Sequence, residues 1–196
     1  MDQYGETTPA QVLPILSNIA IFPALYYTIR NPRVYHLDIF FFVFTYFNSM
    51  LLHTCDQQGR YLCPNIARWR ELDYVTAQFG PAYIALNLYP FKRVSSRNSW
   101  MLIFATIHLI LTELQANDWV SLGGFSVLGF ALFITYFREF RQDRLFFTFF
   151  AAAVGLLFFY FGMQRVYDYT HSVWHFPAMI AYFLILTARK SRLILS

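Results

Sequence analysis

The stretch DYTHSVWHFPAM at residues 168–179 contains two of the five histidines in this 196-residue chain. His171 and His175 are four positions apart, so on a helix their side chains project from the same face. A helix rises about 6 Å over that interval, which would let both imidazoles reach one metal ion. A histidine in apolar surroundings is, however, more often a hydrogen-bonded packing residue. The spacing alone therefore permits a metal site without requiring one.

Three further residues could belong to the same site. His53 ends an earlier apolar stretch, and Ser49 precedes it by one helical turn in NSMLLH, on the same helical face. Asp73 lies at the start of the next apolar stretch, in ELDYV. Three histidines that leave a fourth position open are typical of a catalytic zinc, and a nearby carboxylate can accept a proton there. Whether these residues meet depends on how the chain crosses a membrane.

The composition indicates an integral membrane protein. Hydrophobic residues make up 57% of the chain, aromatic residues 21% and charged residues only 13%, whereas an average soluble domain is about 25% charged. The length allows roughly seven spans of about 20 residues. No repeat or linker interrupts the pattern, so we expect a single domain over residues 1–196. The N-terminal MDQYGETTPA has no signal-peptide features, and the first apolar segment is expected to act as the signal.

Seven apolar stretches predict an all-α fold of seven transmembrane helices. They cover residues 8–29, 36–55, 71–90, 99–116, 119–137, 145–165 and 170–188. The short connection QANDW predicts that the fourth and fifth helices form a tight antiparallel hairpin. The phenylalanine clusters at 40–42, 146–150 and 158–161 are expected to face lipid.

Basic residues give the orientation of these spans. Of the 15 Lys and Arg residues, 11 fall in one set of connections and only four in the other. By the positive-inside rule the richer set is cytosolic, so the N-terminus is outside and the C-terminus is in the cytosol. The pI near 9.1 then reflects topology rather than nucleic-acid binding. The cytosolic set is Arg30, Arg33, Lys92, Arg93, Arg97, Arg138, Arg141, Arg144, Arg189, Lys190 and Arg192, and the outer set is Arg60, Arg68, Arg70 and Arg165.

This orientation brings the candidate ligands to one side of the membrane. His53 ends an outward span, and the histidines of the DYTHSVWH stretch lie in the first two turns of the last, inward span. We therefore predict a zinc site of His53, His171 and His175 near the extracellular face, with Ser49 and Asp73 beside it. The other two histidines, His36 and His108, are expected to be a solvated residue and a packing residue, respectively.

The two cysteines of the chain, Cys55 and Cys63, both fall in the predicted outer loop HTCDQQGRYLC. That face is oxidising, so a disulfide is the favoured interpretation. The alternative of a two-cysteine metal site is weaker, because eight residues is not a usual ligand spacing. Closing so short a loop would stabilise the fold by roughly 2–3 kcal/mol.

Together these motifs resemble the CREST superfamily, which includes alkaline ceramidases and adiponectin/progestin receptors. The matching features are Ser and His one turn apart in SMLLH, Asp in the third span, and HxxxH in HSVWH. Several members of that superfamily are zinc-dependent lipid amidases or hydrolases. The five positions that the resemblance marks are Ser49, His53, Asp73, His171 and His175.

Within the superfamily, the stretches LPILSNIAIFPALYYTIR, LLHTCD, NDW and DYTHSVWH resemble the muscle-cell fusion proteins, and this likeness covers nearly the whole chain. This resemblance implies a multi-pass plasma-membrane protein that promotes myoblast fusion at the hemifusion step. It also implies membrane lipids, a homodimer and a fusion partner on the same or the opposing cell as its partners, with Zn²⁺ as cofactor. The alternative is a zinc-dependent, ceramidase-like lipid amide hydrolase with Asp73 as general base and Ser49 stabilising the oxyanion. A receptor is less favoured, because the receptor relatives have the opposite orientation.

Overall fold

The computed structural model describes residues 9–58, 66–113, 118–162 and 167–188, and nearly all of them are helical. No β-strand occurs within these ranges, which confirms the predicted all-α fold. A helix satisfies every internal backbone N–H and C=O group within its own segment, so it is the natural conformation for apolar stretches of this length.

Each of the seven predicted segments is a helix in the structure. The first consists of α1 (Pro9–Ser17), the short 3₁₀ segment η1 (Asn18–Ile21) and α2 (Phe22–Ile29), which follow one another directly. The remaining elements are α3 (Pro32–Gln58), α4 (Ile66–Leu88), α5 (Val94–Glu113), α6 (Asp118–Tyr136), η2 (Phe137–Glu139), α7 (Gln142–Gly162) and α8 (Tyr167–Ala188).

Four of these segments are long and apolar enough to cross a membrane. They are Val12–Ile29, Tyr35–Cys55, Gln142–Phe159 and Thr170–Ala188, the first, second, sixth and seventh of the predicted spans. The protein is thus a helical membrane protein. Helices α4, α5 and α6 are of similar length to these four segments.

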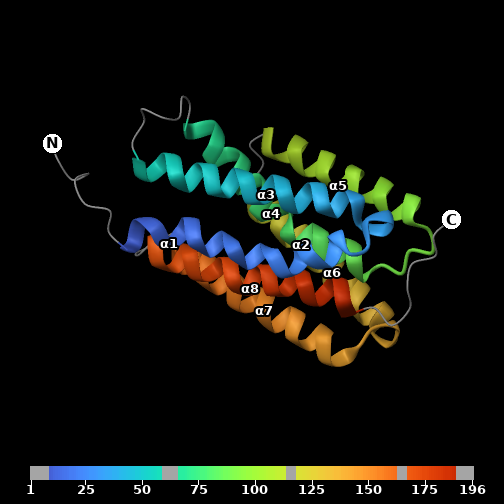
Figure 1. The fold of residues 1–196 in the computed structure, drawn as a ribbon. Helices are drawn as coiled ribbons and strands as arrows, with labels where there is room; N and C mark the ends of the chain where they lie inside the picture. Colours follow the sequence, from blue (N-terminus) through green and yellow to red (C-terminus); the bar gives the residue numbers. More distant parts are fainter. Residues whose placement is uncertain (1–8, 59–65, 114–117, 163–166, 189–196) are drawn as a thin grey trace.

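The first and last helical segments pack against each other, although they are far apart in the sequence. Helix α8 contacts α7 along its length and also packs on α1, η1 and α2 (Figure 1). Among the described residues, helix α6 packs mainly on α4 and only lightly on α5. The connection between α5 and α6 includes residues outside the described ranges, so their tight hairpin stays a prediction. The packing of α1 against α8 is what brings the N-terminal segment to the predicted site.

Aromatic side chains fill the core between α3, α4 and α8. Phe41 stacks on Tyr83 with ring centroids 5.3 Å apart, and Phe42 packs against both Tyr83 and Tyr182. Phe40 is 66% exposed, whereas Phe41 and Phe42 are 9% and 0% exposed. The prediction that all three face lipid is therefore wrong for two of them, because consecutive helical residues cannot share one face.

A buried ion pair joins α3 to α5. The Nη1 atom of Arg97 donates to Asp38 Oδ2 at 2.7 Å, and its Nη2 atom donates to Asp38 Oδ1 at 2.5 Å and to Asn87 Oδ1 at 2.9 Å. Tyr83 also donates to the same carboxylate. Arg97 was counted above among loop residues; instead it lies inside α5 and is only 1% exposed. Removing it from the count leaves the predicted orientation unchanged.

Candidate metal centre

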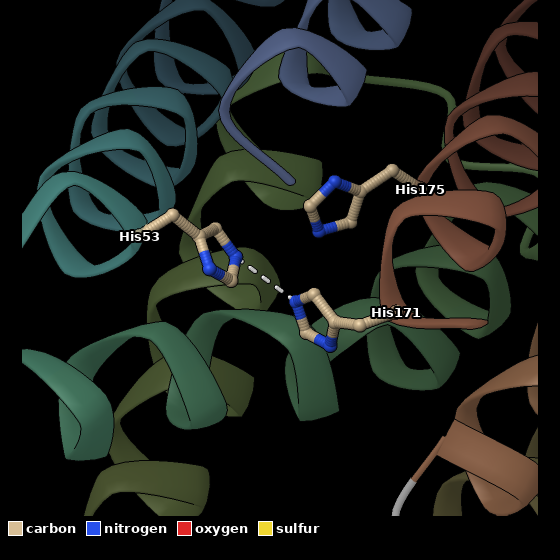
Figure 2. A group of neighbouring side chains, drawn as sticks. All are labelled: His53, His171 and His175. Carbon is tan, nitrogen blue, oxygen red and sulfur yellow. Dashed lines mark hydrogen bonds between the residues drawn. The ribbon is translucent and has the colours of Figure 1, made fainter. Parts of the chain in front are cut away.

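The three histidines singled out in the sequence lie together inside the helix bundle. His53 comes from the last turns of α3, and His171 and His175 come from the first turns of α8. Each offers one ligand nitrogen, and these three atoms lie within 4.8 Å of one another. Figure 2 shows the three rings arranged around a common point. The structure thus unites residues that are more than a hundred positions apart.

The rings are close enough to contact each other directly. The Nε2 atoms of His53 and His171 are 3.0 Å apart, at hydrogen-bond distance. Ring centroids are 4.7 Å apart for His53 and His171, 4.8 Å for His171 and His175, and 5.8 Å for His53 and His175. All three side chains are buried, at 2–5% exposure. Such a buried group of imidazoles is chemically suited to a cation.

The donor set fits zinc. Tetrahedral zinc binds histidine nitrogen at about 2.0–2.1 Å, so two such nitrogens lie about 3.4 Å apart. The His53–His171 nitrogen separation of 3.0 Å and the overall limit of 4.8 Å bracket that value. Small side-chain rotations would therefore bring all three nitrogens into the zinc coordination sphere. Metal binding itself stays a prediction.

The two predicted neighbours of the metal, Ser49 and Asp73, line a cavity beside His175. This cavity is small, because only about 20 Å³ of it is open to the centre of a water molecule. Asp73 is 8% exposed and Ser49 is 3% exposed. Ser49 lies beside the Asp73 carboxyl group, although its hydroxyl makes no hydrogen bond of regular geometry to any described residue. A buried carboxyl group and an available hydroxyl thus adjoin the histidine cluster.

Two further polar atoms face this cavity without a hydrogen-bond partner in the described part of the chain. They are Thr45 Oγ1 and Trp174 Nε1. Trp174 also packs on the ring of His175, with centroids 5.3 Å apart. Buried polar atoms are normally satisfied, so several unsatisfied ones around one cavity indicate a place for water or a polar group.

Sequence reasoning missed one residue of the site, Ser17 at the end of α1. Its hydroxyl lies 2.7 Å from His175 Nδ1. The polar pair Ser17–Asn18 inside an otherwise apolar span is the sequence feature that could have indicated this residue. Polar side chains within membrane spans are uncommon and often functional.

The remaining predicted residues lie away from the cluster or outside the described ranges. His108 is 1% exposed and its Nε2 atom lies 3.0 Å from the carbonyl oxygen of Val75, as expected for a packing histidine. His36 is exposed and contacts Asn98. Cys55 is buried near the end of α3, whereas Cys63 lies outside the described residues, so their disulfide stays a prediction.

Fold and site together define a helical membrane protein with a buried three-histidine cluster. The chain belongs to the family described as "Protein of unknown function (DUF3522)", whose model matches residues 7–176. That region contains all three histidines, Ser49, Asp73 and Ser17. A comparison with curated proteins gives no match.

Proposed function

We propose that this protein is a plasma-membrane fusion protein of the myomaker type, which promotes myoblast–myoblast fusion at the hemifusion step. In this proposal it crosses the membrane seven times, with the N-terminus outside and the C-terminus in the cytosol. Its partners are membrane lipids, a second copy of the chain, and a fusion partner on the same or the opposing cell. The likeness to myomaker rests on LPILSNIAIFPALYYTIR, LLHTCD, NDW and DYTHSVWH, taken in this order along the chain.

The observation that carries the proposed role of zinc is the burial of His53, His171 and His175 between α3 and α8. A zinc ion bound there would link two helices whose sequences are far apart. Metal ligation of this kind contributes directly to the stability of a fold. We therefore propose that the zinc is mainly structural and holds the outer ends of the spans in the arrangement that fusion requires.

Gain of fusion in cells tests this proposal. The full chain is expressed on fibroblasts, which are co-cultured with fusion-competent myoblasts, and nuclei per cell are counted. We expect multinucleate cells with the unaltered chain and their loss with His171→Ala. His36→Ala is the matched control, because His36 belongs to the same helix as His53 but is exposed and distant from the cluster. Absence of fusion at normal surface expression of the unaltered chain would refute the proposal.

A second candidate, a zinc-dependent hydrolase of ceramide-like lipid amides, is favoured by the cavity beside His175. Zinc bound there would polarise the lipid carbonyl group and activate water. Asp73 would accept a proton from the attacking water, and the Ser49 hydroxyl would donate a hydrogen bond to the developing oxyanion. The residues that line the cavity come from η1, α3, α4 and α8, and they would shield the reacting group from bulk water on these sides.

The two candidates differ in their response to Asp73→Asn. This change keeps the shape of the side chain but removes its capacity to act as a base, so a hydrolase would lose activity by about 10²–10⁴-fold. A structural metal site would keep both zinc and fusion. The measurement is turnover of acylated sphingolipids by the purified protein, together with the cell-fusion count for the same variant.

A further inference from the structure

Ser17 has one hydroxyl proton, and the positions of its two neighbours determine which of them accepts its hydrogen bond. Ser17 Oγ lies 2.8 Å from the carbonyl oxygen of Pro14 and 2.7 Å from Nδ1 of His175. A carbonyl oxygen can only accept a hydrogen bond, so Ser17 must donate its proton to Pro14. The hydroxyl oxygen must then accept a hydrogen bond from His175, whose Nδ1 atom carries the proton.

This assignment leaves the other nitrogen of His175 free to bind a metal. A neutral imidazole carries one proton, so a protonated Nδ1 places the unshared electron pair on Nε2. In Figure 2 one ring nitrogen of His175 faces the other two histidines and the second points away from them. Nothing else in the described residues hydrogen-bonds to His175. Ser17 therefore controls both the tautomer and the orientation of this ring.

The local backbone of the first span supports that contact. The helix changes from α to 3₁₀ geometry at Asn18, directly after Ser17. The Nδ2 atom of Asn18 donates to the same Pro14 carbonyl oxygen at 3.0 Å. Ser17 is only 1% exposed, so solvent cannot replace it as the partner of His175.

We propose that Ser17 is a positioning residue for the metal centre, which holds His175 as the Nδ1–H tautomer with Nε2 directed at the ion. The inference rests on the proposed metal centre and extends it to a third element, because Ser17 belongs to α1 whereas the ligands belong to α3 and α8. Hydrogen bonds of this kind to a metal-bound histidine typically change metal affinity by about 10–100-fold.

The test is zinc affinity of the purified full chain, measured by competition with a chelator of known affinity. We expect Ser17→Ala to bind zinc about 10–100-fold more weakly, and Ser17→Thr, which keeps the hydroxyl, to bind near wild-type strength. Thr28→Val is the matched control. Thr28 is also buried and also donates to the carbonyl oxygen three residues earlier, that of Leu25, at 2.8 Å, but it is distant from the cluster.

A spectroscopic readout makes the test independent of folding defects in the variant. In zinc-free wild-type protein with labelled histidines, nuclear magnetic resonance should show His175 as the Nδ1–H tautomer. An Nε2–H tautomer, unchanged affinity in Ser17→Ala, or an equal loss in Thr28→Val would overturn the inference. His175→Ala distinguishes failure of the Ser17 proposal from failure of the metal centre on which it rests. If His175→Ala binds zinc like the wild type, the metal centre itself is refuted, irrespective of the result for Ser17→Ala.

Discussion

The imidazole ring of His175 contacts Ser17, the cavity and the other two histidines of the cluster. Its Nδ1 atom is hydrogen-bonded to Ser17 on α1, and its side chain lines the cavity that contains Asp73. The rings of His53 and His171 also lie against the ring of His175. A substitution at this residue therefore removes a member of the histidine cluster, a contact to the first span and part of the cavity wall together. Any functional effect of His175→Ala has to be compared with that of His171→Ala.

Gly80 makes room for the side chain of Tyr182, which lines the cavity. A Cβ atom at this position would collide with the Tyr182 hydroxyl. We expect Gly80→Ala to destabilise the protein by about 1–3 kcal/mol, because overpacking forces neighbours out of their rotamers. Thermal unfolding in detergent measures this effect.

Two variants make the Gly80 prediction specific. Gly124→Ala should be neutral or slightly stabilising, because no atom of the described residues lies within 4 Å of its added Cβ and alanine favours a helix. The double variant Gly80→Ala with Tyr182→Phe should recover most of the lost stability, since the colliding atom is removed. Equal unfolding temperatures for Gly80→Ala and Gly124→Ala would contradict the explanation.

At the residue scale, the sequence was sufficient to predict that the three histidines lie together, but not which residue hydrogen-bonds to them. HxxxH spacing and the distribution of basic residues were enough to nominate His53, His171 and His175. The contact of Ser17 with His175 joins residues 158 positions apart, and it depends on how α1 packs on α8. No periodicity encodes that packing, so the hydrogen bond became visible only in three dimensions.

At the element scale, the pair of Arg97 and Asp38 fixes α5 against α3. Both side chains are buried, at 2% and 0% exposure. Arg97→Ala is expected to destabilise the protein by about 3–5 kcal/mol, because it leaves a buried carboxylate without its counter-charge. Chemical or thermal unfolding of the purified protein measures this loss.

The exposed pair of Arg141 and Asp143 is the matched control for that prediction. These side chains are 49% and 59% exposed and their charged atoms are 3.3 Å apart. Arg141→Ala should cost less than about 1 kcal/mol, since water already screens the pair. If Arg97→Ala and Arg141→Ala had the same effect, the buried pair would not be what holds α5 in place.

The helices themselves were predictable because apolar stretches of about 20 residues have few alternatives in a membrane. The packing partners of each helix could not be predicted in the same way. A run such as Phe40–Phe42 looks uniformly apolar in sequence, yet its residues divide between the surface and the aromatic core. Arg97 likewise reads as a loop charge unless the position of Asp38 is known.

At the scale of the whole molecule, the proposed orientation can be tested with thiol reagents. With the N-terminus outside, Cys55 and Cys63 lie on the outer face, and their disulfide should resist a membrane-impermeant alkylating reagent on intact cells until it is reduced. In a chain without these two cysteines, Arg141→Cys should react only after the cells are permeabilised. Labelling of Arg141→Cys on intact cells would contradict the orientation, and labelling of Cys63 without reduction would contradict the disulfide.

The histidine cluster and its hydrogen-bond partner Ser17 come from both ends of the sequence. Helix α1 supplies Ser17, α3 supplies His53, and α8 supplies His171 and His175. Helix α1 packs against both α8 and α3, and this packing brings these residues together. Zinc would add a specific link at one end of this packed bundle.

The most direct test of this account is the zinc content of the purified protein, measured by elemental analysis. We expect about one zinc per chain in the wild type, as for a single three-histidine site, and a sharp fall in both His171→Ala and His175→Ala. His108→Ala is the control, since His108 is buried and hydrogen-bonded but distant from the cluster. Zinc content that stays at the wild-type level in both ligand variants would contradict the metal centre.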